Sequence, residues 1–78
     1  MDRNELKSLC TKARATAHMG ALYRNLDTNG YFVCQNVALD TNNNANVIFA
    51  PLGHEGVISL VVSMDVWLKT YKKVEAPN

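Results

Sequence analysis

A chain of 78 residues forms one small domain with a single layer of core side chains, and it leaves no room for a second domain and a deep cleft between the two. Hydrophobic residues make up 47% and charged residues 19% of the sequence, a balance that excludes an intrinsically disordered chain. The formal net charge of +1 argues against a general polyanion binder. From the length and the composition we expect a single globular domain over residues 1–78.

The first predicted element is a helix that Asp2 or Asn4 can cap. Small side chains on its apolar face would let the helix axis approach its packing partner closely. The C-terminal end of this helix has two alternatives. The helix can stop near Gly20 and leave residues 21–26 as a short strand, or it can continue to Leu26. We favour the longer helix. Its apolar face consists of Leu6, Leu9, Cys10, Ala13, Ala17 and either Gly20 or Ala21.

The middle of the chain predicts strands joined by short polar turns. Tyr, Phe and Val content indicates a strand over residues 31–39, after a tight turn at 27–30. A polar loop at 40–46 leads to a second strand at 47–50. Glycines and a proline mark residues 51–56 as the next turn. These connections are short enough for antiparallel neighbours.

Residues 57–62 form the longest nearly apolar run, and we expect a strand that is covered on both faces or lies centrally in the sheet. Ser63 can cap the helix that follows, with Asp65 in its first turn and lysines towards its end, as the helix dipole favours. The apolar stripe of that helix is Met64, Trp67, Leu68, Tyr71 and Val74.

The sequence therefore predicts an α+β fold. A small three-stranded, or four-stranded, antiparallel meander carries an N-terminal and a C-terminal helix, in the order αβββα. The side chains that we expect to be mostly buried are Phe49, Val61, Trp67 and Leu68. A sheet edge, or the sheet face away from the helices, would expose Tyr31, Val33 and Val47 unless a partner covers them.

Metal and cofactor sites are not expected. The 40–46 loop begins like a calcium loop, but Ala45 stands where glycine is needed and Pro51 where the bidentate glutamate belongs. The candidate zinc ligands lack the close spacing of a structural site, since they are Cys10, His18, Cys34 and His54. Two cysteines on a helix and a strand indicate two buried thiols rather than a disulfide.

An enzyme is the class with the least support. Cys34 could pair with His54, but a nucleophilic thiol needs exposure and a lowered pKa, whereas Cys34 is expected within an apolar strand. No phosphate-binding loop, dinucleotide fingerprint or nucleophile elbow is present. The His54 and Glu55 pair at a glycine-flanked loop tip is a better candidate for binding, because loops carry binding residues.

Charge distribution gives a second set of candidate contact residues. If both helices cover the same sheet face, the helical side is basic and the loop ends are acidic. Such a face could meet an acidic protein surface or nucleic-acid phosphates. The basic residues that we single out for partner binding are Lys12, Arg14, Lys69, Lys72 and Lys73.

Two functional classes follow. The first is a non-enzymatic protein-binding module, a regulator or inhibitor that occupies a partner's surface, with a homodimer as part of its action. The second is a nucleic-acid binder that uses the basic helical face. Small proteins of this build are frequent among phage and mobile-element products. From the size of the chain and the lack of an active-site motif, we hypothesise that it is such a product. A polar N-terminus and the lack of an apolar stretch of about 20 residues predict a cytoplasmic protein with no membrane contact.

Overall fold

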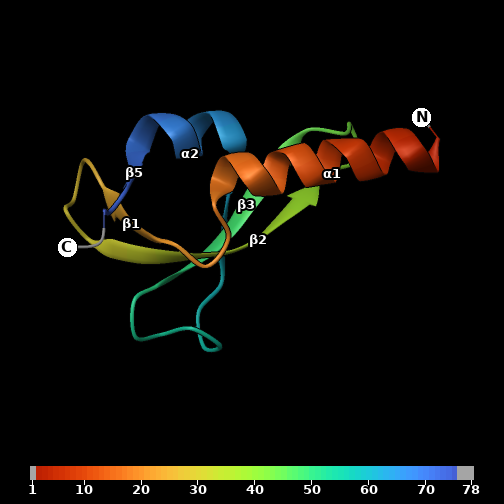
Figure 1. Cartoon of the computed structure of the whole chain (residues 1–78). Coiled ribbons are helices and arrows are strands. Elements are labelled where there is room, and N and C mark those ends of the chain that lie inside the picture. The colour runs from red at the N-terminus through yellow and green to blue at the C-terminus, as the bar shows by residue number, and fades with distance from the viewer. Residues whose placement is uncertain (1, 76–78) are drawn as a thin grey trace.

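The computed structural model describes residues 2–75 as two helices and one antiparallel sheet (Figure 1). The strand order across the five-stranded sheet is β4-β3-β2-β1-β5. In chain order the elements are α1 (Arg3–Ala17), β1 (Leu22–Asn25), β2 (Tyr31–Leu39), β3 (Ala45–Pro51), β4 (Leu60–Ser63), α2 (Met64–Thr70) and β5 (Tyr71–Lys73).

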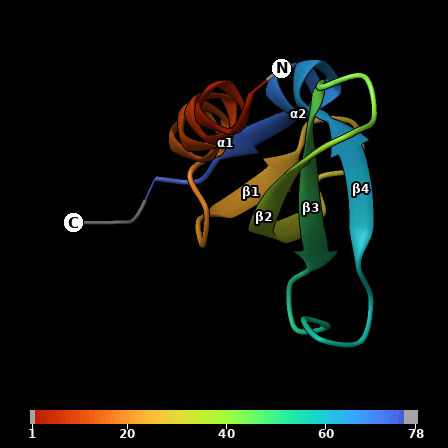
Figure 2. The same cartoon turned by 90° about the vertical axis from the view of Figure 1, so that its right-hand side faces the viewer.

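The predicted α+β class is confirmed: an N-terminal helix and a later short helix accompany an antiparallel meander. The meander has four strands, β1 to β4, and β5 adds a fifth beside β1. Both helices lie over the same face of the sheet, and the connection from β3 to β4 projects away from them (Figures 1 and 2). The molecule therefore has a helical layer on one side of the sheet and no helix on the other side within residues 2–75.

The first helix is shorter than we favoured. Asp2 caps α1 by accepting a 2.9 Å hydrogen bond from the Glu5 amide, and His18 ends it in the left-handed region at φ 55°. The prediction of a helix to Leu26 was wrong, and the alternative of a short strand is confirmed. The strand β1 forms because its residues pair with β2 on one side and with β5 on the other, so tertiary pairing decided the local structure.

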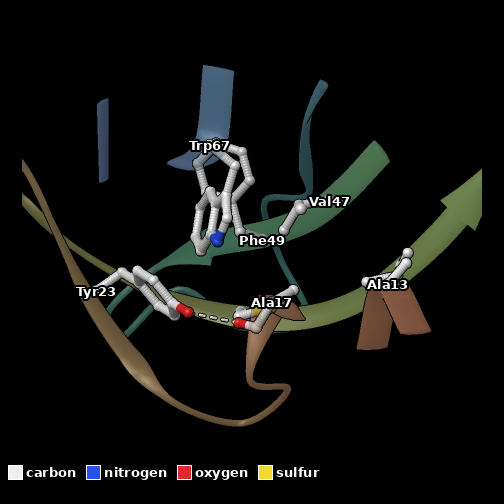
Figure 3. Close-up of a cluster of buried hydrophobic side chains, with 8 residues drawn as sticks. Ala13, Ala17, Tyr23, Val47, Phe49 and Trp67 are labelled. Carbon is white, nitrogen blue, oxygen red and sulfur yellow. Dashed lines mark hydrogen bonds between the residues drawn. The ribbon is translucent and has the colours of Figure 1, made fainter. Parts of the chain in front are cut away.

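The core centres on Trp67, which is fully buried (Figure 3). Its ring lies 4.4 Å from that of Tyr23, 5.0 Å from that of Phe49 and 4.5 Å from that of Tyr71, measured between centroids. Offset and tilted aromatic pairs at such distances stabilise beyond simple area burial. Ala13 and Ala17, in the C-terminal half of α1, complete this layer. Their small side chains let the helix approach β2 closely.

The second helix also ends earlier than predicted. Ser63 caps α2, as expected, by accepting from the Val66 amide. The helix stops at Thr70, and Tyr71 begins β5, so the predicted helical stripe through Tyr71 and Val74 was wrong. A strand wins here because the edge of β1 supplies backbone partners, including the Leu22 carbonyl that accepts from the Val74 amide at 2.8 Å.

The expected central strand is in fact an edge. Only residues 60–62 of the apolar run lie in β4, which ends at Ser63 and pairs with β3 alone. Val61 is 68% exposed and Leu68 is 54% exposed, so their predicted burial was wrong, whereas that of Phe49 and Trp67 is confirmed. Val47 points into the core and is fully buried, contrary to expectation.

We predict that Trp67→Ala lowers the free energy of unfolding by about 3–5 kcal/mol, because it removes the side chain that four elements share. The matched control is Leu68→Ala on the same helix, which should change stability by less than about 1 kcal/mol because that side chain is half exposed. Urea unfolding followed by circular dichroism measures both. Equal losses for the two variants would contradict this description of the core.

A second prediction concerns Tyr23, whose buried hydroxyl donates a 2.6 Å hydrogen bond to the Ala17 carbonyl at the end of α1 (Figure 3). Burial raises its pKa above the ordinary 10.0, and the nearby Trp67 indole N–H partly offsets that rise. The folded state therefore keeps a proton that the unfolded state loses as pH rises past 10.0, so folding stability falls there.

Replacing Tyr23 by Phe should cost about 1 kcal/mol at neutral pH, through the lost hydrogen bond. The same change should make the alkaline loss of stability shallower than in the unmodified protein. Tyr31→Phe is the control, since Tyr31 is 48% exposed. Denaturant titrations at neutral pH and above pH 10.0 test both parts, and identical alkaline slopes for all three proteins would refute the second.

Candidate interaction surface

The sheet has one face that no helix covers, and strand alternation determines which side chains lie on it. Tyr23, Cys34, Val47 and Phe49 belong to the core beneath the helices, so their neighbours along the same strands point the opposite way. We call this opposite side the open face. It is defined by Leu22, Arg24, Tyr31, Val33, Ile48, Val61 and Lys72.

Apolar side chains occupy the middle of the open face in cross-strand pairs. Leu22 stands opposite Val33, which in turn stands opposite Ala50 on β3. Ile48 stands opposite Val61. Directly opposed aliphatic residues contact each other across antiparallel strands, so these side chains form one apolar strip from β1 to β4.

One end of the open face is basic and aromatic. Arg24 lies opposite Tyr31 on β2 and opposite Lys72 on β5. Its guanidinium Nη1 donates a 2.7 Å hydrogen bond to the side-chain oxygen of Asn29. Like charges directly opposite each other destabilise a sheet, so the facing Arg24 and Lys72 cost the fold stability.

The connection between β3 and β4, residues 52–59, projects beyond the sheet, and we call it the arm (Figures 1 and 2). Every residue of the arm is exposed. Its backbone is folded on itself, since the His54 carbonyl accepts from the Val57 and Ile58 amides at 3.1 Å. Gly53 and Gly56 adopt φ of 89° and 85°, which suits glycine.

Large hydrophobic side chains concentrate at the arm and at β4. Val57 is 82% exposed, and the others are Leu52, Ile58, Leu60 and Val61. Scattered exposed hydrophobics are ordinary on a small protein, but a continuous group marks an interaction site. The arm therefore extends the apolar character of the open face past the edge of the sheet.

The residues that the sequence singled out for partner binding do not lie together. His54 and Glu55 are exposed at the arm. Lys12 and Arg14 are exposed on α1, and Lys69 on α2. Lys72 and Lys73, which we had placed on the last helix, belong to β5 and point to opposite faces of it, because Lys72 faces Arg24 and Lys73 faces Tyr23. The expected basic helical face thus loses Lys72, whereas Lys73 stays on the helical side of the sheet.

The asparagine-rich loop uses its carboxylate to close itself. Asp40 accepts hydrogen bonds from the backbone amides of Asn44 at 2.9 Å and Asn42 at 2.8 Å. The pKa of Asp40 is lowered, mainly because its carboxylate accepts the hydrogen bond from the Asn44 amide. The Asn42 amide and neighbouring side chains contribute to the lowering, and desolvation opposes it. Among residues 2–75, no three His, Cys, Asp or Glu side chains gather in a way that could hold a metal ion.

Both cysteines carry free thiols. Cys34 is fully buried, burial raises its pKa, and neither it nor the partly exposed Cys10 forms a disulfide. A thiol kept protonated beneath the helices is a poor nucleophile. At 15 and 7 residues, α1 and α2 are too short to cross a bilayer, and residues 2–75 contain no other helix.

Sequence reasoning missed the residues that build the open face. Arg24 and Leu22 were assigned to an extended helix, which hid their alternation with Tyr23. Ile48 lies between two core residues in an uninterrupted apolar run, so no polar position revealed that it faces the other way. The available signal was alternation in residues 22–25, once that segment is considered as a strand.

No protein-family model matches this sequence, and no curated protein or solved structure is significantly similar to it.

The facing cations generate a stability prediction. Lys72→Glu should raise the free energy of unfolding by about 0.2–1 kcal/mol, because an opposite charge then faces Arg24. Lys73→Glu is the matched control: it has the same charge change on the same strand but faces Tyr23, and it should give no gain. Thermal unfolding of the two variants in low salt makes the comparison. A gain with Lys73→Glu and none with Lys72→Glu would contradict the assigned register.

Proposed function

We propose that this chain is a small non-enzymatic protein-binding module, a regulator or inhibitor that occupies the surface of a partner protein, with self-association as part of its action. The observation that carries the proposal is the open face together with the arm. One face of the sheet has no helical cover within the described residues. On that face Leu22, Val33 and Ile48 are partly exposed and Val61 is 68% exposed, and exposed aliphatic side chains continue onto the arm. A partner that covers them would remove apolar surface from water.

The basic end of the open face supports the same proposal. Arg24 and Lys72 oppose each other at a cost in stability, and Tyr31 beside them is half exposed. Arginine and tyrosine are enriched among residues that dominate binding energy. An acidic or carboxylate-bearing segment of a partner would relieve the repulsion between the two cations. The origin in a phage or mobile element is part of this proposal, on grounds of size and the lack of an active-site motif.

Nucleic acid is the second candidate partner. Tyr31 beside Arg24 and Lys72 offers one ring for base stacking and two cations for phosphates. The remaining basic residues lie elsewhere, on α1, on α2 and on the other side of β5. A chain of net charge +1 with its cations dispersed in this way is better suited to a protein partner.

A pair of double variants tests the proposal. The variant Tyr31→Glu/Lys72→Glu reverses the charge of the open face, and Leu68→Glu/Lys69→Glu makes the same charge change on the helical side. Each protein, tagged and confirmed as folded by circular dichroism, is used to isolate partners from the cells that produce it, with quantitative mass spectrometry. We expect proteins that the unmodified chain and the helical-side variant retain and the open-face variant loses.

The same samples are titrated with single-stranded and duplex oligonucleotides over a range of salt concentrations. Tight binding that weakens steeply with salt, together with no protein lost selectively from the open-face variant, would contradict the proposal in favour of nucleic acid. Loss of the protein partner with the helical-side variant alone would place the contact on α2 and would equally contradict it.

A further inference from the structure

The two edges of the sheet differ in charge. At one edge, β5 exposes Lys72 on one face and Lys73 on the other. Lysine on an edge strand discourages further pairing, since a second copy would bring like charges together. At the opposite edge, β4 pairs only with β3, and no described strand lies on its outer side. The outward backbone groups of β4 are therefore available to another strand.

The chain around β4 is uncharged. No Asp, Glu, Lys, Arg or His occurs from Gly56 to Met64, so another strand can approach without desolvating a charge. Val57, Ile58, Leu60 and Val61 are all exposed along this segment. In Figure 2, β4 forms the outer border of the sheet, with the arm continuing from it.

The segment is also nearly palindromic. Residues 59–63 read Ser-Leu-Val-Val-Ser. Antiparallel pairing of two copies about a two-fold axis perpendicular to the sheet, centred on Val61, places Val61 opposite its own copy. Leu60 then faces Val62 and Ser59 faces Ser63, so aliphatic residues meet aliphatic residues and hydroxyls meet hydroxyls. Pairs of this kind are the unit of sheet stabilisation.

From this arrangement we infer that a second copy of this chain occupies the outer edge of β4, which joins the two five-stranded sheets into one continuous sheet. The inference specifies the self-association that the proposed function includes. An unrelated strand would find no charge here to fix its register, whereas a two-fold axis matches each residue with a like residue. The axis also puts both open faces on one side of the joined sheet, which doubles the contact surface.

Val61 is the position to test, because it lies on the axis and is largely exposed in the single chain. Sedimentation equilibrium should give twice 8.7 kDa for the unmodified protein at micromolar concentration. Val61→Lys and Val61→Glu should each give 8.7 kDa, because like charges then face each other across the axis. An equimolar mixture of the two variants should restore the double mass, because opposite charges then face each other.

The control is Leu9→Lys on α1, an exposed leucine on a helix that packs against β2 and β3, which should stay dimeric. Circular dichroism confirms that each variant is folded. A monomeric unmodified protein, a Val61→Lys variant that stays dimeric, or a mixture that stays monomeric would each overturn the inference.

The outcomes separate this inference from the proposed function. If the unmodified chain is monomeric and the Tyr31→Glu/Lys72→Glu variant still loses a protein partner, the edge pairing and the self-association fail, while binding of a partner protein through the open face stands. If the Val61 series behaves as expected and no partner depends on the open face, the dimer stands and the proposed function fails.

Discussion

The burial of Trp67 against three other aromatic rings is the interaction on which the rest of the structure depends. Its indole lies between Tyr23 of β1, Phe49 of β3 and Tyr71 of β5, so one side chain joins strands that are far apart in the sequence. A domain of this size has a single core layer, and that layer can fill only one side of the sheet. The concentration of aromatic volume on the helical side therefore leaves the other side without cover.

The close aromatic packing on the helical side leaves one polar group of Trp67 without a hydrogen bond within the described part of the chain. The Trp67 N–H is fully buried and has no hydrogen-bond acceptor among the described residues. An unpaired buried donor costs free energy, and here the packing of four elements offsets that cost. The structure thus favours aromatic packing over complete hydrogen bonding on the side that provides stability, while Arg24, Val61 and Lys72 lie on the side that we propose for binding.

Much of the fold follows from local sequence, and the errors share one physical cause. Caps at Asp2 and Ser63, the strand at 31–39 and the burial of Trp67 depend on nearby residues or on strong composition. The short segments 22–25 and 71–73 gave misleading local signals, because residues 22–25 become a strand by pairing with β2 and β5, and residues 71–73 by pairing with β1. Neither segment's sequence contains the identity of its pairing partner.

The candidate surface was less predictable than the fold for a related reason. Charged residues can be found in a sequence without knowing which face they occupy, so Lys72 and Lys73 were grouped although the pleat separates them. The apolar run at 57–62 suggested a central strand, and its high hydrophobicity is equally compatible with an exposed edge that a partner covers. Ile48 and Val61 became recognisable as surface residues only when the register of β3 and β4 was known.

The central claim is that the helical side provides stability and that the edge at β4 and the open face provide contacts. Methyl NMR spectra of a specifically labelled sample, recorded during stepwise dilution, test this most directly. The account predicts that the methyl signals of Ile58, Leu60 and Val61 shift as the chain dissociates, while those of Leu6 and Leu9 on α1 stay constant. Shifts confined to Leu6 and Leu9, or no shift at any methyl group, would contradict it.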